Sequence, residues 1–192
     1  MKKLFTLFLA LVASVGIASA QSGTCGDNLT WTLVDSVLTI SGTGAIQNVT
    51  WGSYKSSIKS VIINDGVTSI GQSAFSGCSS LKSVTIPNSV TSIGQYAFRD
   101  CSSLTSVTIP NSVTSIGKYA FYYCSSLTSI NVDTNNPNYC SIDGVLFNKD
   151  KTTLIQYPIG NTRSEYIIPN SVTSIGEWAF SGCKSLTSVT IG

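Results

Sequence analysis

Six cysteines are the residues of this 192-residue chain with the widest choice of chemistry, which includes disulfide formation and metal binding. Four of them follow an Ala-Phe pair at the same distance, and these four are Cys78, Cys101, Cys124 and Cys183. A cysteine in such an apolar setting behaves as a small core hydrophobe. The first three recur every 23 residues, which is not a metal-binding spacing either. Export would permit disulfides, but we expect these four to be buried free thiols.

Histidine is absent, which removes Ser-His and Cys-His nucleophile pairs and the commonest metal ligand. A Ser-Lys pair is conceivable, but the repeat described below accounts for the many serines, so we expect neither enzyme activity nor a cofactor. Oxygen ligands for calcium occur between Asp133 and Asn138, with Asp143 nearby. Their spacing does not fit an EF-hand loop, and Pro137 falls where a ligand would be needed. We therefore expect a polar turn and no metal there.

The first 20 residues have the features of an export signal. Lys2 and Lys3 precede an apolar run over residues 4–17, and small residues lead up to Ala20. We expect cleavage after Ala20, no transmembrane segment in the mature chain, and a protein that is secreted or at the cell surface. An uncleaved anchor is one alternative. Lipid attachment at Cys25 is another, although that cysteine lacks the apolar residue of a lipobox.

The charge balance limits the class of partner. The chain has 11 Lys and Arg against 9 Asp and Glu, and the excess equals the two lysines of the export signal. The mature chain is therefore formally neutral. It offers no basic cluster for a run of phosphates or for an anionic membrane, so we expect no nucleic-acid partner.

A 23-residue repeat organises most of the chain. Residues 81–103 recur almost unchanged as residues 104–126, with differences at Lys82/Thr105, Gln95/Lys118, Arg99/Tyr122 and Asp100/Tyr123. Self-similarity at such a period marks a solenoid of stacked coils. We number the coils as residues 58–80, 81–103, 104–126, 127–162 and 163–185, and Leu186 begins a sixth. The fourth coil is stretched to 36 residues.

Each coil is expected to contain two short extended segments and one turn. In the second coil, Val84 and Ile86 would point inward from a strand that Pro87 ends. A second extended segment follows at residues 90–93, and a helical or 3₁₀ turn over residues 94–101 would complete the core. Stacking would place Val61, Val84, Val107, Ile130, Tyr166 and Val189 in one row.

Two segments depart from the repeat. Residues 21–57 contain an alternating segment, residues 29–33, and a return strand at residues 37–40. We predict a β-hairpin that caps the solenoid of residues 58–192. In the fourth coil, residues 145–147 and 154–157 flank a turn and predict a second hairpin.

The combined pattern of residues 58–192 resembles the BspA-like leucine-rich repeats of bacterial surface proteins. It is carried by runs such as Leu81-Lys-Ser-Val-Thr-Ile-Pro, Ile93-Gly-Gln-Tyr-Ala-Phe and Cys101-Ser-Ser, and by the insertion near Asp143-Gly-Val-Leu-Phe-Asn148. The resemblance implies a β-rich, curved solenoid with a parallel sheet on one face. It also implies secretion or surface display, and adhesion or protein binding rather than catalysis. Larger members often carry more repeats and a separate attachment region, which puts surface anchoring in question here.

Positions that vary within so strict a repeat indicate exposure and contact with a ligand. The aromatic candidates are Tyr96, Tyr119, Tyr122, Tyr123 and Trp178. The sheet face offers Lys82, Thr85, Thr105, Thr108 and Asn131. The alternative for the aromatic residues is that they only cover the edge of the turn. An ordered threonine surface would also suit ice binding, but Ile62, Asn131 and Ile167 interrupt it.

These observations favour a secreted or cell-surface protein that binds an extracellular protein or glycan, as in adhesion to host or neighbouring cells. The alternative function is a structural module that associates with itself, since the last strand, ending at Ile191, is expected to be an uncovered edge.

Overall fold

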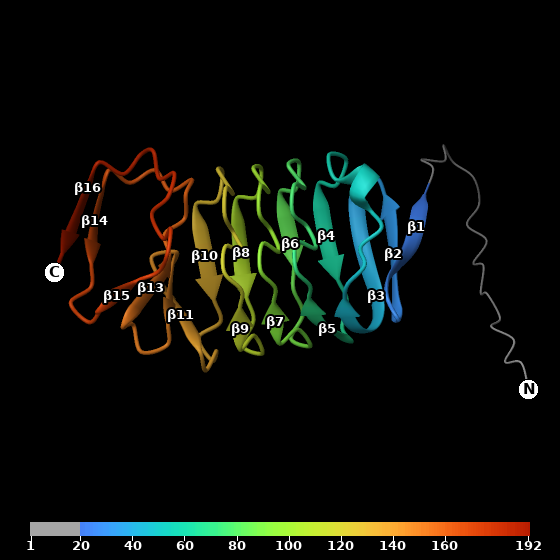
Figure 1. The fold of residues 1–192 in the computed structure, drawn as a ribbon, viewed down its shortest axis with the longest axis horizontal. Coiled ribbons are helices and arrows are strands. Elements are labelled where there is room, and N and C mark those ends of the chain that lie inside the picture. The colour runs from blue at the N-terminus through green and yellow to red at the C-terminus, as the bar shows by residue number, and fades with distance from the viewer. Residues whose placement is uncertain (1–19) are drawn as a thin grey trace, which may run out of the picture.

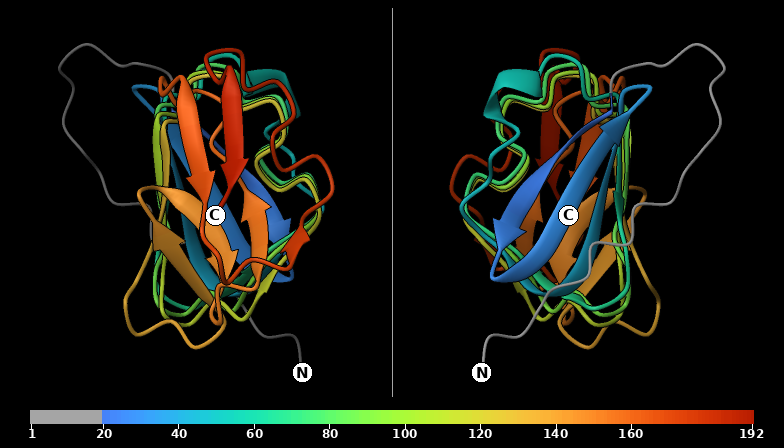
Figure 2. Two further views of the ribbon diagram at one scale, coloured as in Figure 1. Left: turned by 90° about the vertical axis from the view of Figure 1, so that its left-hand side faces the viewer. Right: turned by 90° about the vertical axis from the view of Figure 1, so that its right-hand side faces the viewer.

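The computed structural model describes residues 20–192. The predicted export signal lies almost wholly in residues 1–19, outside the described residues. The chain forms a solenoid whose coils stack along the long axis of the molecule (Figure 1). Viewed along that axis, the regular coils overlay one another closely (Figure 2). The predicted β-rich solenoid of 23-residue coils is confirmed.

Two rows of short parallel strands build the wall of the solenoid, as the alternation of β-branched residues predicts. The first row contains β4 (Ser60–Ile63), β6 (Ser83–Thr85), β8 (Ser106–Ile109) and β10 (Ser129–Val132). The second row contains β5 (Val67–Ile70), β7 (Ser92–Ile93) and β9 (Ser115–Ile116). Pairing is in register with the repeat, so that Val84 lies beside Val61 and Ile130 beside Val107.

A three-stranded antiparallel meander begins the described fold. It consists of β1 (Gln21–Gly26), β2 (Asn28–Val34) and β3 (Val37–Ile46). The predicted hairpin corresponds to β2 and β3, whereas β1 was not predicted because its sequence has no apolar alternation. Strand β3 pairs in parallel with both β4 and β5 and so starts both rows of the solenoid. Trp51 follows it, just before the 3₁₀ helix η1 (Gly52–Tyr54).

Aromatic rings stack along the core at the repeat period. The ring centroids of Trp51 and Phe75 are 5.5 Å apart, those of Phe75 and Phe98 are 5.3 Å apart, and those of Phe98 and Phe121 are 5.6 Å apart. All three pairs are nearly parallel, with interplanar angles of 5–17°. All four rings are buried. Burial of such large side chains dominates the stability of a core, and the ladder ties the N-terminal meander to the third coil.

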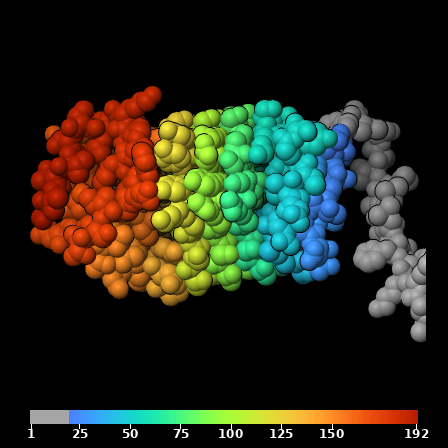
Figure 3. Space-filling model, viewed as in Figure 1, coloured from blue at the N-terminus to red at the C-terminus, as the bar shows by residue number. Residues whose placement is uncertain are grey.

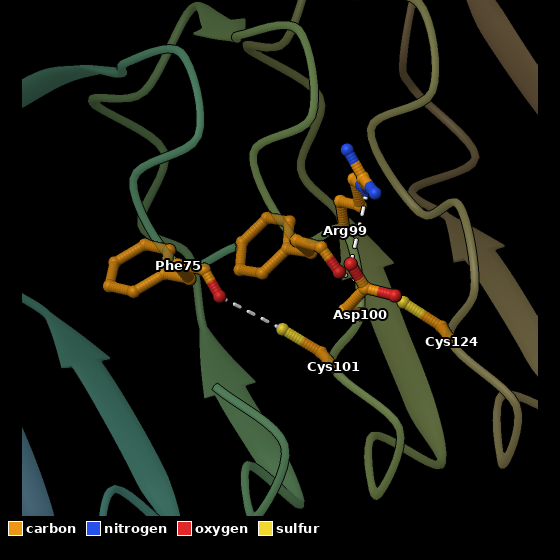
Figure 4. Close-up of polar contacts among 6 residues, drawn as sticks. Phe75, Arg99, Asp100, Cys101 and Cys124 are labelled. Atoms are coloured by element: carbon orange, nitrogen blue, oxygen red, sulfur yellow. Dashed lines mark hydrogen bonds and ion pairs between the residues drawn. The ribbon is translucent and has the colours of Figure 1, made fainter. Parts of the chain in front are cut away.

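Buried thiols run parallel to this aromatic ladder. The Cys101 thiol donates to the Phe75 carbonyl over 3.2 Å (Figure 4). The Cys124 thiol donates to the Phe98 carbonyl over 3.0 Å. Burial raises the pKa of the Cys78 and Cys124 thiols to about 12. The prediction of buried free thiols is confirmed for Cys78, Cys101 and Cys124. It is only half right for Cys183, which is free but partly exposed.

The turns of the regular coils are not helical. Of the two forms expected, a helical turn and a 3₁₀ turn, only the second describes them. In the second coil, amides of Ala97, Arg99 and Cys101 donate to carbonyls three residues earlier, as in a 3₁₀ turn. Tyr96 and Asp100 interrupt the run with φ values of 57° and 59°. A left-handed residue cannot continue a right-handed helix, so η1 is the one helix in residues 20–192.

The fourth coil interrupts both rows. It contains β11 (Tyr139–Ile142), β12 (Val145–Asn148) and β13 (Thr153–Gln156), and the predicted hairpin is the antiparallel pair of β12 and β13. The outer edge of β10 meets the β11–β12 turn, where the Ile130 amide donates to the Gly144 carbonyl over 2.8 Å. The predicted continuous row is therefore wrong at this point. Tyr166 pairs with Val189 rather than stacking on Ile130, because the insertion occupies the place beside β10.

Regular stacking resumes in the fifth coil. Its strands are β14 (Glu165–Ile168) and β15 (Ser174–Ile175), which pair in parallel with β16 (Ser188–Ile191) and β13 respectively. The buried residues of this region form a second hydrophobic cluster, separate from the main core.

Candidate binding site

The structure brings the five predicted aromatic residues together on the turns of the second, third and fifth coils. Tyr96 and Tyr119 stack with ring centroids 5.3 Å apart. Tyr122 lies at the centre, with its ring centroid 5.8 Å from that of Tyr119, 4.1 Å from that of Tyr123 and 6.2 Å from that of Trp178. We call these five residues the aromatic surface.

A short turn in the fourth coil explains how the third and fifth coils meet. Leu154 aligns with Ile175, the equivalent of Ile93, and Arg163 is the equivalent of Leu104. Eight residues separate Leu154 from Arg163, whereas ten separate Ile93 from Leu104. The turn of the fourth coil between Leu154 and Arg163 is therefore two residues shorter than the same turn of a regular coil. The gap that this shorter turn leaves is bordered by the fifth coil. Figure 3 shows the result, since yellow atoms of the third coil lie directly beside red atoms near the C-terminus.

Most of the aromatic surface is held in a backbone conformation that disfavours large side chains. The φ values are 57° at Tyr96, 61° at Tyr119, 59° at Tyr123 and 62° at Trp178. This region costs a residue with a Cβ roughly 1–2 kcal/mol. Where Tyr123 stands in the third coil, the first and fifth coils have Gly77 and Gly182, both also at positive φ. The chain thus carries aromatic rings where glycine would be less strained, and such strain concentrates at functional sites.

Charged side chains complete the site. The Trp178 indole donates to the Glu177 carboxylate over 3.1 Å, and Lys118 lies 3.6 Å from the same group. A hydrogen bond between the Tyr119 hydroxyl and Glu177 lowers the pKa of Glu177 and raises that of Tyr119.

Arg99 belongs to the other end of this surface. Its guanidinium lies 5.6 Å from the centroid of the Tyr96 ring, within the range of a cation–π contact. Its Nε is also 3.0 Å from the carboxylate of Asp100 (Figure 4). Arg99 and Asp100 therefore give this edge of the aromatic surface polar groups of both signs.

Sequence reasoning did not select Lys118 and Glu177. Both occupy the repeat position that Gln95 holds in the second coil, and the Gln95/Lys118 difference was visible in the aligned repeats. Variation at that position was the signal that could have found them.

Two hollows adjoin at Tyr119. One, of about 370 Å³, lies among the aromatic residues and Arg99. The other, of about 390 Å³, is a crevice between the third and fifth coils, with walls that include Ile116, Ile155 and Ile175. The aromatic surface therefore forms the rim of a deeper, more apolar depression.

The predicted sheet-face residues lie apart from the aromatic surface. All are exposed on or beside the strands of the first row, and they are Lys82, Thr85, Thr105, Thr108 and Asn131. Thr85 and Thr108 border a shallow hollow of about 320 Å³. Hydroxyls on this face also serve the ladder, as when Thr128 donates to the Thr105 carbonyl over 3.1 Å. This face is flatter and offers no exposed ring, so we rank it second.

The polar run of the fourth coil forms a turn that covers part of the third coil. The Asp133 carboxylate accepts from the Asn135 amide over 2.8 Å, and the buried Asn136 side chain donates to the carbonyls of Pro110 and Val113. Within residues 20–192, no group of three or more His, Cys, Asp or Glu is placed to hold a metal ion. No helix in that part of the chain is long and apolar enough to cross a bilayer.

Comparison with known families identifies the repeat. The model of the BspA-type leucine-rich repeat region matches residues 46–166 and 160–192, in six copies. The chain belongs to this family. The predicted resemblance is therefore confirmed, and the match includes part of β3 and Trp51 ahead of the first predicted coil.

Solved structures that resemble this chain include leucine-rich repeat proteins. A leucine-rich repeat protein from Eubacterium ventriosum is 28% identical with a TM-score of 0.50, and the alignment covers 90% of this chain and 62% of that one. The pneumococcal vaccine antigen PcpA is 20% identical with a TM-score of 0.63, covering 90% of this chain and 64% of that one. This chain thus spans less than two thirds of either relative. A leucine-rich cell surface protein from Faecalibacterium prausnitzii is 23% identical with a TM-score of 0.47, covering 88% and 76%. The comparison with curated proteins gave no match.

Proposed function

We propose that this BspA-type repeat protein binds an extracellular macromolecule through the aromatic surface. One observation carries the proposal: four aromatic residues of this surface are kept at positive φ, a conformation that Ser73 adopts without a ring at the equivalent position of the first coil. Tyrosine and tryptophan are the residues that most often supply binding energy at interfaces.

The shape and exposure of the surface support this proposal. Trp178 is 54% exposed and Tyr123 is 47% exposed, while Tyr122 between them is partly buried. A partner that covered these rings would bury a large apolar area around a fixed central residue. Arg99 and Glu177 stand at opposite ends of the surface and give a partner polar groups of both signs.

Secretion or surface display, and adhesion to host or neighbouring cells, form the biological part of the proposal. They rest on the export features of residues 1–20 and on the likeness of the repeat to bacterial surface proteins. A scaffold of stacked coils, with a predicted mature chain that is formally neutral and without histidine, suits recognition of another molecule better than catalysis.

A binding screen with immobilised extracellular-matrix proteins and a glycan array tests the proposal. The variants Tyr123→Gly and Trp178→Gly remove exposed rings and relieve positive φ, so they should stay folded and lose most of the binding. Thr85→Ala and Thr108→Ala on the sheet face are the matched controls and should bind normally. The absence of saturable binding, or loss of binding only in the threonine variants, would contradict the proposal.

Self-association is a second candidate function. It is favoured by exposed apolar side chains on β14, β15 and β16, namely Ile167, Ile175, Val189 and Ile191. Light scattering across a range of concentrations tests it, since a monomer at every concentration would exclude it.

A further inference from the structure

We infer that the crevice between the third and fifth coils binds an extended peptide segment of the partner, held by backbone hydrogen bonds to residues 119–123. The inference rests on the proposed function and specifies the partner as a protein. It arises from the backbone hydrogen bonds that join one coil to the next.

At their turns, neighbouring regular coils are joined by backbone hydrogen bonds from the amide of every second residue. In the first coil, the amides of Ser73, Phe75 and Gly77 donate to carbonyls of the second coil over 2.9, 2.8 and 2.7 Å. The equivalent amides of the second coil, at Tyr96, Phe98 and Asp100, donate to the third coil over 3.2, 2.8 and 2.9 Å. Each turn therefore presents three donors, spaced two residues apart, to the backbone carbonyls of the next coil.

The third coil has the same donors without the neighbour. The amides of Tyr119, Phe121 and Tyr123 have no hydrogen-bond partner among residues 20–192. No amide of the fourth coil donates to the Ile116 carbonyl, whereas its equivalent at Ile93 accepts from the Gly117 amide of the next coil over 2.7 Å. Phe121 is only 3% exposed. Buried backbone donors are nearly always paired in native proteins, so this edge is suited to an added backbone.

The fourth coil covers the rest of the same edge. Asn136 binds the carbonyls of Pro110 and Val113 over 2.7 and 2.9 Å, and the Tyr139 hydroxyl accepts from the Ile116 amide over 3.0 Å. Side chains of the insertion thus replace the missing coil up to Ile116. Beyond that residue the edge is open, and this is where the crevice lies.

The crevice walls favour apolar side chains. Ile116, Leu146, Ile155 and Ile175 line a volume of about 390 Å³. Lys118 and Glu177 stand at the rim and pair with each other. A glycan would leave many hydroxyls unpaired against such walls. An extended peptide places alternate side chains in the crevice and offers carbonyls to the free amides, as in strand addition to an open edge.

Hydrogen exchange tests the free protein first. The Phe121 amide should exchange at least tenfold faster than the Phe98 amide, since both lie in the same repeat position and only Phe98 is bonded to the next coil. Equal protection of the two amides would overturn the inference, because the edge would then be closed. NMR spectroscopy of the mature chain measures the exchange rates of the two amides separately.

Selection from a phage library of random linear peptides supplies the ligand probe. The expected peptides carry alternating apolar residues, protect the Phe121 amide on binding, and bind Ile175→Arg at least tenfold more weakly. Ile167→Arg is the matched control, since Ile167 is 69% exposed on β14, Ile175 is 48% exposed, and only Ile175 lines the crevice. Protection of the Phe98 amide and of the Tyr157 amide, which donates to the Ala179 carbonyl over 2.9 Å, verifies in both variants that the coils before the insertion and the coils after it remain folded.

The outcomes separate this inference from the proposed function. Peptides that bind without protecting Phe121, or that bind Ile175→Arg normally, overturn the crevice assignment. The proposed function still stands in that case if Tyr123→Gly abolishes binding. Enrichment of glycans on the array with no selected peptide overturns the choice of a peptide. Failure of both screens overturns both proposals.

Discussion

Replacing Tyr123 with glycine and with alanine tests whether the aromatic surface is held under backbone strain. Both variants remove the ring, and with it the contact to Tyr122, whose ring centroid is 4.1 Å away. They differ in how they tolerate the φ of 59°. Alanine retains the left-handed penalty of roughly 1–2 kcal/mol, while glycine avoids it but loses about 0.4–1 kcal/mol through the entropy of the unfolded chain. We expect the glycine variant to be about 1 kcal/mol more stable than the alanine variant.

Tyr122 provides the control, because it is not among the residues with positive φ. There the order should reverse, with alanine more stable than glycine by roughly 0.5–1 kcal/mol. Urea unfolding followed by circular dichroism measures the free energy of unfolding of all four variants. In thermal unfolding, a difference of 1 kcal/mol would shift the melting temperature by about 2–4 °C for a chain of this size. An alanine variant at position 123 as stable as the glycine variant would refute the reasoning, since the backbone would then be free to leave the left-handed region.

Three further predictions concern the core. Phe98→Ala should lower the free energy of unfolding by about 3–5 kcal/mol, measured in urea, because the buried ring stacks on both sides. Tyr166→Phe should raise it by about 1 kcal/mol, because the buried hydroxyl has no partner among residues 20–192; an unchanged value would show that the hydroxyl is satisfied. The raised pKa of about 12 at Cys78 and Cys124 means that the folded chain keeps protons that the unfolded chain releases above about pH 9. Stability should therefore fall between about pH 9 and 12, by up to about 1.4 kcal/mol per pH unit for each thiol, and Cys78→Ala with Cys124→Ala should flatten that slope.

Most of the solenoid could be predicted because its period is strict. A fixed spacing of 23 residues places Val84 beside Val61 and Ile93 beside Ile70 without knowledge of any other contact. The buried thiols followed from the same logic, since Cys101 and its equivalents must share one environment. Cys183 departs from it because the fifth coil is less covered than the others.

The contacts of the aromatic surface could not be predicted from the repeat alone. Tyr122 and Trp178 are far apart in the sequence, and their rings can touch only because the shortened turn of the fourth coil does not separate them. The residue count between Leu154 and Arg163 was available, but its consequence required knowing that Leu154 of β13 aligns with Ile175 of β15. Likewise, Tyr166 left its expected row because a hairpin turn competes for the edge of β10. Local periodicity carries no information about such competition.

The interrupted ladder also has a consequence for folding cooperativity. In a repeat protein each coil is stabilised mainly by its nearest neighbours, so a weak junction divides the molecule into units that can open separately. The aromatic core ladder reaches Phe121, and the cluster around Phe147, Tyr157 and Tyr166 lies beyond it. The C-terminal unit should therefore unfold at lower denaturant than the coils before it, and a partner bound across the junction would join the two units into one cooperative structure.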